Sequence, residues 1–145
     1  MNAIKNYSVF LLIGLAAAWI SSELKSTFLH EFLGGLLLTL EVALLAINTT
    51  ARTALLGKIK DMGEKGEFQF KRTADAMSSA LVEQVAVICI TVLFLIFYKT
   101  PLIAENSLIS LFITAVLVAC FGVCVQIVYD TAKAIMILLD DQTRS

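Results

Sequence analysis

Apolar residues form four long runs along this 145-residue chain, and short polar segments separate the runs. The runs cover residues 4–22, 31–60, 73–98 and 107–129. A helix needs about 20 predominantly apolar residues to cross the hydrocarbon core of a bilayer, and each run reaches about that length. The pattern predicts an all-α, polytopic membrane protein with four transmembrane helices, folded as a single domain over residues 1–145.

The first run also has features of a signal peptide, because a basic lead precedes an apolar stretch and small residues. Trp19 is typical of an interfacial anchor at the end of a span, so we interpret the run as a retained helix. Small residues line one face of this run and one face of the fourth, and such faces let helices approach closely. They are Gly14, Ala17 or Ala18 and Ser21 in the first run, and Ala115, Ala119 and Gly122 in the fourth.

Basic residues concentrate from Arg52 to Arg72, at the end of the second run and in the segment that leads to the third. Six of the eleven Lys and Arg residues lie there: Arg52, Lys58, Lys60, Lys65, Lys71 and Arg72. Because cytoplasmic loops hold the excess of Lys and Arg, this loop and both termini are expected in the cytoplasm. We therefore predict a bacterial inner-membrane protein, N-in and C-in, with a charged cytoplasmic loop over 58–74. The second and fourth helices should extend into the cytoplasm, the fourth as a C-terminal extension over 131–145.

A single carboxylate, Glu41, lies within the part of the second run expected in lipid. A charge at the bilayer centre costs about 2.5 kcal/mol or more, so such groups face protein or water and are functional candidates. Around a helix, Gly34, Glu41, Asn48 and Arg52 fall close to one line. Two interpretations stay open. Glu41 specifies packing against a neighbouring helix, or it lines a water-filled path formed by several subunits.

Four further polar residues lie near membrane depth in the third and fourth runs: Glu83, Gln84, Gln126 and Asp130. Glu83 and Gln84 are either interfacial groups or members of a polar site. Asp130 is expected to pair with Lys133, or with Arg52 across the bundle. The loop residues Lys58, Lys60, Lys65, Lys71 and Arg72 also have two interpretations. They bind anionic lipid, at about 1 kcal/mol each, or they dock a cytosolic protein.

The composition agrees with the membrane class and argues against several others. The chain is 59% hydrophobic and 16% charged, whereas soluble domains are about 45–50% apolar and about 25% charged. A net charge of −1 argues against direct binding of nucleic acid through phosphate attraction. No hydrolase, phosphate-loop or dinucleotide motif is present, so we expect no enzyme, no catalytic residue and no cofactor. Cys89, Cys120 and Cys124 lie in apolar runs, and we expect them to pack rather than to bind a metal.

Four short hydrophobic helices, the charged loop from Arg52 to Arg72 and little other soluble mass resemble small bacterial membrane proteins of phage defence. The outline is similar to the membrane component of the Rex exclusion system, a proposed ion channel. It is also similar to the four-helix membrane subunit of the Kiwa system, which assembles as an oligomer and holds a cytosolic partner. The resemblance covers the whole chain as topology. It implies a role in antiviral defence and assigns no role to any residue.

The leading hypothesis is a homo-oligomeric inner-membrane assembly that conducts or gates ions. Glu41 and Asn48 would line the path and Arg52 would stand at its cytoplasmic mouth. Conduction would need several subunits, because the core of one four-helix bundle fills with side chains. The alternative is a non-conducting membrane anchor or sensor that recruits a soluble cytosolic effector. A third, weaker hypothesis is a small proton-coupled transporter that uses Glu41.

Overall fold

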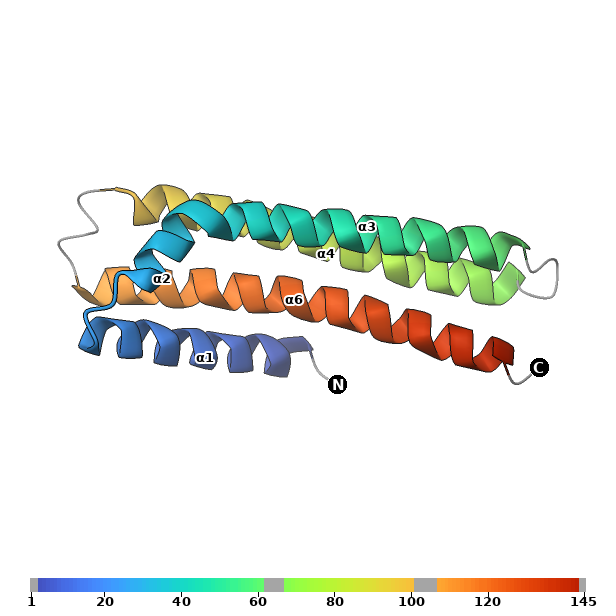
Figure 1. The fold of residues 1–145 in the computed structure, drawn as a ribbon, viewed down its shortest axis with the longest axis horizontal. Helices are drawn as coiled ribbons and strands as arrows, with labels where there is room; N and C mark the ends of the chain where they lie inside the picture. The colour runs from blue at the N-terminus through green and yellow to red at the C-terminus, as the bar shows by residue number, and fades with distance from the viewer. Residues whose placement is uncertain (1–2, 62–66, 101–106, 144–145) are drawn as a thin grey trace.

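The structure, a computed structural model, describes residues 3–61, 67–100 and 107–143, and within them the side chains of 7–57, 78–100 and 107–136. All regular elements in these ranges are helical (Figure 1), which confirms the all-α prediction. The elements are α1 (Ala3–Glu23), α2 (Phe28–Glu31), the π-helical segment η1 (Phe32–Leu36), α3 (Leu37–Asp61), α4 (Glu67–Tyr98) and α6 (Ser107–Thr143).

Three stretches of the described chain are long enough and apolar enough to cross a membrane, which indicates a membrane protein. They are Phe28–Gly57, Ser78–Tyr98 and Ser107–Met136. The apolar part described in α1, Tyr7–Glu23, is shorter than these three. The second, third and fourth predicted spans are thus long and apolar enough, whereas the first span and the orientation in the membrane stay predictions.

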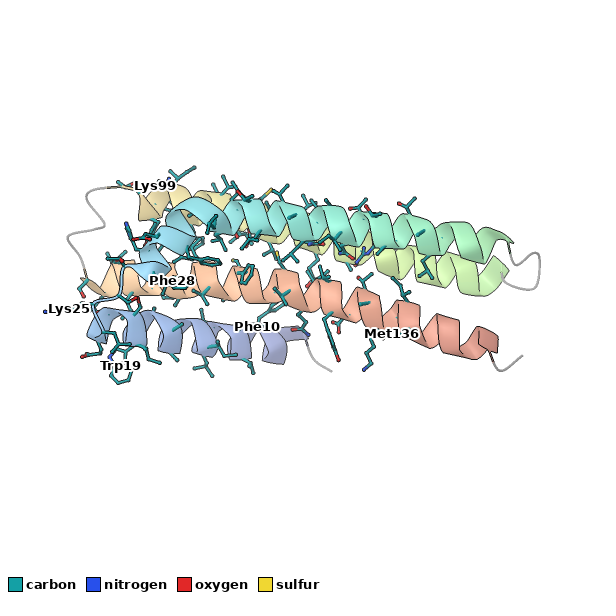
Figure 2. All side chains as sticks on the ribbon, in the orientation of Figure 1. Phe10, Trp19, Lys25, Phe28, Lys99 and Met136 are labelled. Carbon is teal, nitrogen blue, oxygen red and sulfur yellow. The ribbon has the colours of Figure 1, made fainter. Side chains whose placement is uncertain are left out.

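Helix α6 lies at the centre of the bundle, where α1, α3, α4 and η1 all pack against it. α1 lies alongside the first half of α6, and α3, α4 and α6 run past the N-terminal end of α1 (Figure 1). Trp19, Lys25, Phe28 and Lys99 gather at one end of the bundle, which we name the α2 end (Figure 2). Tryptophan and tyrosine favour the membrane–water interface, so Trp19 suits an interfacial position at this end.

The apolar core lies where η1 and the start of α3 meet α6. Four side chains form its buried centre: Leu33, Leu37, Ile113 and Leu117. Aromatic rings close it on one side, because Phe32 and Phe121 meet edge to face with their centroids 5.6 Å apart. This cluster fixes η1 and the first turn of α3 against α6 and so positions Glu41, one turn after Leu37.

The π-helical segment changes which residues share the buried face of this helix. Gly34 was expected on the line through Glu41, but it is only partly buried and Leu33 takes that place. A π-helical turn contains more residues than an α-helical turn, so it rotates the preceding residues around the axis. The buried positions therefore run through Leu33, Leu37 and Glu41 in steps of four. The predicted line holds only from Glu41 onward.

The small-residue faces predicted from the sequence meet in the structure. A Cβ placed on Gly14 of α1 would lie 2.2 Å from the backbone oxygen of Ala115 on α6. Ala18 and Ala115 are both buried in the same contact region. Further along, the ring of Phe10 covers Gly122. Because backbone rather than side chain faces Gly14, α1 can pack this closely only if that position has no side chain.

Replacing Gly14 by alanine should therefore destabilise the bundle by about 1–3 kcal/mol, because α1 must move away from Ala115. Unfolding of the purified protein in detergent measures the change. Gly57→Ala is the matched control, since a Cβ placed on Gly57 would have no atom of a neighbouring side chain or helix within 4 Å and alanine favours helix more than glycine does. Equal stability of the two variants would contradict the close contact between α1 and α6.

Helix α1 ends in a left-handed turn at Lys25, with φ 50°. The Lys25 N–H donates to the Ser22 carbonyl at 3.2 Å, and the Ser26 N–H donates to the Ser21 carbonyl at 3.0 Å. This pair of bonds is the Schellman arrangement, in which the left-handed position is usually glycine. A residue with a Cβ costs about 1–2 kcal/mol more in this conformation. The chain therefore places a lysine where glycine would fit better.

Candidate functional site

Among the side chains that the structure describes, six polar ones are buried between α3, α4 and α6, and we name them the polar row. They are Glu41, Asn48 and Arg52 on α3, Gln84 and Thr91 on α4, and Thr131 on α6. None is more than 8% exposed. Buried polar groups require hydrogen-bond partners, because each unpaired group costs about 1–3 kcal/mol. The partners of these six side chains therefore define the site.

Two hydrogen bonds join α3 to α4 across the row. The Thr91 hydroxyl donates to Oε1 of Glu41 at 3.0 Å, and Nδ2 of Asn48 donates to Oε1 of Gln84 at 2.6 Å. In both helices the two paired positions are seven residues apart, which is about two turns or about 10 Å. The antiparallel helices therefore bring polar residues together twice, in the same register and on the same face.

Arg52 links this pair of helices to α6. Its Nε donates to Oδ1 of Asn48 at 3.0 Å, and its Nη2 donates to Oγ1 of Thr131 at 3.1 Å. The Thr131 hydroxyl donates in turn to the carbonyl of Ile127 at 3.0 Å. Asn48 is thus held between Gln84 and Arg52, so α3, α4 and α6 share one hydrogen-bonded network.

Two buried atoms of the polar row have no hydrogen-bond partner among the described residues: Oε2 of Glu41 and Nε2 of Gln84. One is an acceptor and the other is a donor. Unsatisfied groups of this kind are uncommon in folded proteins and call for an explanation such as water, an ion or a proton. Each of these two atoms can therefore form a further hydrogen bond.

Of the four further polar residues predicted on α4 and α6, one belongs to the polar row and three lie outside it. Gln84 joins the polar row, whereas Glu83, next to it, accepts a hydrogen bond from the Tyr7 hydroxyl on α1. Gln126 is partly exposed and Asp130 is exposed on α6. Asp130 was expected to pair with Lys133 or Arg52, but its neighbour Thr131 takes the place beside Arg52.

The predicted docking residues of the loop lie outside the side chains that the structure describes. These are Lys58, Lys60, Lys65, Lys71 and Arg72. Their role in binding lipid or a cytosolic protein stays a prediction.

Sequence reasoning missed Thr91 and Thr131. A pattern signal for Thr91 exists, since it follows Gln84 by seven residues on α4 as Asn48 follows Glu41 on α3. Thr131 has no such signal, because a threonine in an apolar helix commonly bonds to the carbonyl four residues earlier. Thr131 makes that bond as well as the one to Arg52.

We compared the chain with known proteins. No protein-family model, no curated protein and no solved structure matches it.

Proposed function

We propose that this protein spans the bacterial inner membrane four times, with both termini in the cytoplasm, and assembles as a homo-oligomer that conducts or gates ions. The observation that supports conduction is the polar row. It holds a carboxylate, Glu41, that is fully buried at membrane depth with one oxygen unpaired. Ionisable groups at this depth are costly, and they commonly belong to ion or proton pathways.

In this proposal the ion path runs along the polar row, inside each protomer and between α3, α4 and α6. The side chains of Glu41, Asn48 and Arg52 are 0–3% exposed on the single chain, so no surface of theirs is left for a neighbouring subunit. Access to Glu41 then requires the helices to separate. Interhelical hydrogen bonds in membranes contribute about 0.6 kcal/mol each on average, so the few bonds of the polar row can break reversibly.

Membrane anchoring of a cytosolic effector is the second candidate function. Its support is helix length, because α4 has 32 residues and α6 has 37, whereas about 20 cross the bilayer core. The surplus of α3, α4 and α6 lies beyond the N-terminal end of α1 (Figure 1). A projecting three-helix end of this kind would offer a partner a surface. For either function we propose antiviral defence as the setting, on the resemblance of topology alone.

The two candidates are separated by the mass of the assembly and by its ability to leak ions. Native mass spectrometry of the extracted protein gives the number of subunits and any protein retained with them. Liposomes that contain the same preparation are then loaded with a cation-sensitive dye. A cation gradient is then set up across the liposome membrane. A homo-oligomer that dissipates this gradient supports conduction. A complex with a soluble protein in liposomes that stay tight supports the anchor and contradicts conduction.

A further inference from the structure

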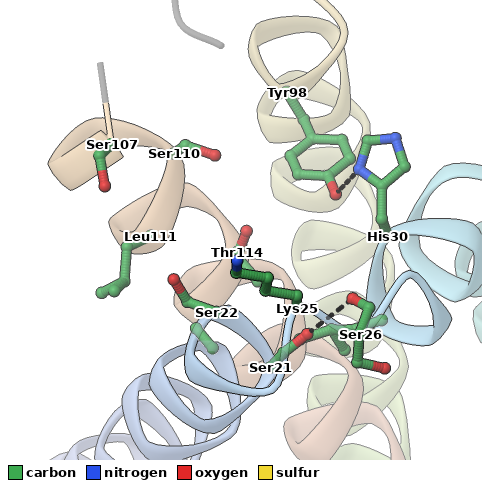
Figure 3. A pocket seen from close by; sticks show the side chains of 12 residues that line it. Ser21, Ser22, Lys25, Ser26, His30, Tyr98, Ser107, Ser110, Leu111 and Thr114 are labelled. Atoms are coloured by element: carbon green, nitrogen blue, oxygen red, sulfur yellow. Dashed lines mark hydrogen bonds between the residues drawn. The ribbon is translucent and has the colours of Figure 1, made fainter. Parts of the chain in front are cut away.

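A polar pocket of about 380 Å³ lies at the α2 end of the bundle, away from the polar row. The end of α1, the turn that follows it, α2, the end of α4 and the first turns of α6 line it (Figure 3). Most of its lining residues are polar, including five serines and one threonine. Such a lining is unusual beside helices this apolar, so the pocket requires an explanation of its own.

The pocket offers hydrogen-bond donors and one positive charge, that of Lys25. Lys25 and Thr114 of α6 both line it, and their side chains overlap in the view of Figure 3. Within the part of the chain that the structure describes, no carboxylate lines the pocket. Hydroxyl groups can donate, and a lysine ammonium has three donors and no acceptor. Donors around a cation favour an anion with several oxygens, and phosphate is the commonest of these.

Several of the hydroxyls are left without partners. Ser21 is used locally, because its hydroxyl donates to the Ser26 carbonyl at 3.3 Å. The hydroxyls of Ser22, Ser110 and Thr114 have no hydrogen bond to a described residue, although all three line the pocket. Ser107 and Ser110 belong to the first turn of α6, where backbone N–H groups lack intrahelical acceptors and favour negative charge.

The backbone at Lys25 has an unusual conformation. Lys25 occupies the left-handed position of the α1 turn, where glycine would be favoured. A non-glycine residue in such a conformation often marks a functional constraint rather than a folding requirement. Lys25 lines the pocket, and its ammonium group is a positive charge that a glycine could not supply.

Histidine and tyrosine close the opposite wall of the pocket. Nδ1 of His30 and the Tyr98 hydroxyl are 2.6 Å apart, and their rings lie 5.3 Å apart between centroids. This contact ties α2 to the end of α4 and holds the wall in place. The pocket therefore forms from elements that are already fixed to one another.

Three large apolar side chains next in sequence to lining residues are exposed. Leu24 is 72% exposed, Phe28 is 71% exposed and Leu108 is 79% exposed, and each stands in sequence between or beside lining residues. Tyr98 lies in the wall, and Trp19, also at this end, is 61% exposed. Aromatic residues of this kind mark the headgroup level of a bilayer. The acyl chains of a lipid whose headgroup bound here would lie near these apolar side chains.

From this combination we propose that the pocket binds the phosphate group of an anionic phospholipid. Lys25 and the hydroxyls of Ser22, Ser110 and Thr114 hold the phosphate, and the acyl chains lie against Leu24, Phe28 and Leu108. Basic pockets between membrane helices bind lipid headgroups in this manner. The site does not depend on ion conduction, nor on which leaflet faces the α2 end.

The test uses the whole protein in nanodiscs of phosphatidylcholine and phosphatidylglycerol, with bound phosphatidylglycerol counted by native mass spectrometry. Lys25→Gln and Lys25→Gly should each lower its retention about fivefold, the factor expected for one lysine. Lys99→Gln is the matched control, because Lys99 is exposed at the same end but does not line the pocket. It should retain the lipid as the unchanged protein does.

Stability separates loss of the site from loss of the fold. Lys25→Gly should unfold at a higher temperature than the unchanged protein, since glycine adopts the left-handed turn without the Cβ penalty. A more stable variant that has lost its lipid supports the site. Equal losses in the Lys25 and Lys99 variants, or no loss in either, would overturn it. Inorganic phosphate that binds through Lys25 without enrichment of phosphatidylglycerol would also overturn it, in favour of a soluble anion.

Discussion

Replacing Asn48 by leucine is expected to destabilise the protein by about 2–4 kcal/mol. Asn48 bonds to Gln84 on one side and to Arg52 on the other. A neutral interhelical bond in a membrane contributes about 0.6 kcal/mol, so losing the Gln84 contact alone predicts a small effect. The larger part comes from Arg52, because a buried charged group that loses a partner costs several kcal/mol. Unfolding in mixed detergent micelles measures the change.

A double variant distinguishes these two parts. Asn48→Leu combined with Gln84→Leu removes both members of the α3–α4 bond, and removing both partners of a bond is nearly neutral. It should recover about 1 kcal/mol and leave the cost at Arg52. Val42→Leu is a control for volume, since Val42 is exposed on the same helix. An Asn48→Leu protein as stable as the unchanged one would show that the polar row does not hold the bundle together.

Replacing Arg52 by glutamine is expected to raise cation flux about tenfold. Arg52 is 3% exposed and lies at the end of the polar row away from the α2 end, where it faces Asn48 and Thr131. Its charge opposes a cation that approaches along the row. Two like charges 4 Å apart at an effective dielectric constant of about 20 repel by about 4 kcal/mol, and a tenfold change needs only about 1.4 kcal/mol.

Glutamine is chosen because its amide can still bond to Asn48 and Thr131. Flux is measured in liposomes at matched protein content, with Lys99→Gln as the control for a lost surface charge. Unchanged or lower flux in the Arg52→Gln protein, at normal insertion and stability, would mean that cations do not pass along the polar row.

Much of the helical layout was readable from the sequence. Long apolar runs with few breaks dictate helices, and three of them reach membrane-spanning length in the structure. Gly14 and Ala115 were readable as small positions, and the structure brings them into contact. Glu41, Asn48 and Arg52 were readable as one line because the helix is regular from Glu41 onward.

The sequence did not predict which helices pack against these three residues. Periodicity shows that Glu41, Asn48 and Arg52 share a face, but it does not show which helix covers the face. A line of polar residues suits a seam between subunits as well as the interior of one chain. The structure places it in the interior, because Gln84, Thr91 and Thr131 arrive from two other helices.

Local backbone departures were also beyond the sequence pattern. The π-helical segment over Phe32–Leu36 moves Gly34 off the predicted line. The left-handed turn at Lys25 is hidden because lysine is rarely found in that conformation. The pocket at the α2 end forms where five chain segments meet, and no single stretch of sequence indicates that these segments are in contact.

The most direct measurement of ion movement through the polar row is single-channel recording of the purified protein beside its Glu41→Gln variant. Glu31→Gln serves as the control, because Glu31 is an exposed carboxylate at the α2 end. We expect discrete cation currents from the unchanged protein and from Glu31→Gln. Glu41→Gln should lose the preference for cations, since the amide has no negative charge. Silent bilayers for the unchanged protein in every oligomeric state, or identical currents from all three proteins, would contradict conduction through the polar row.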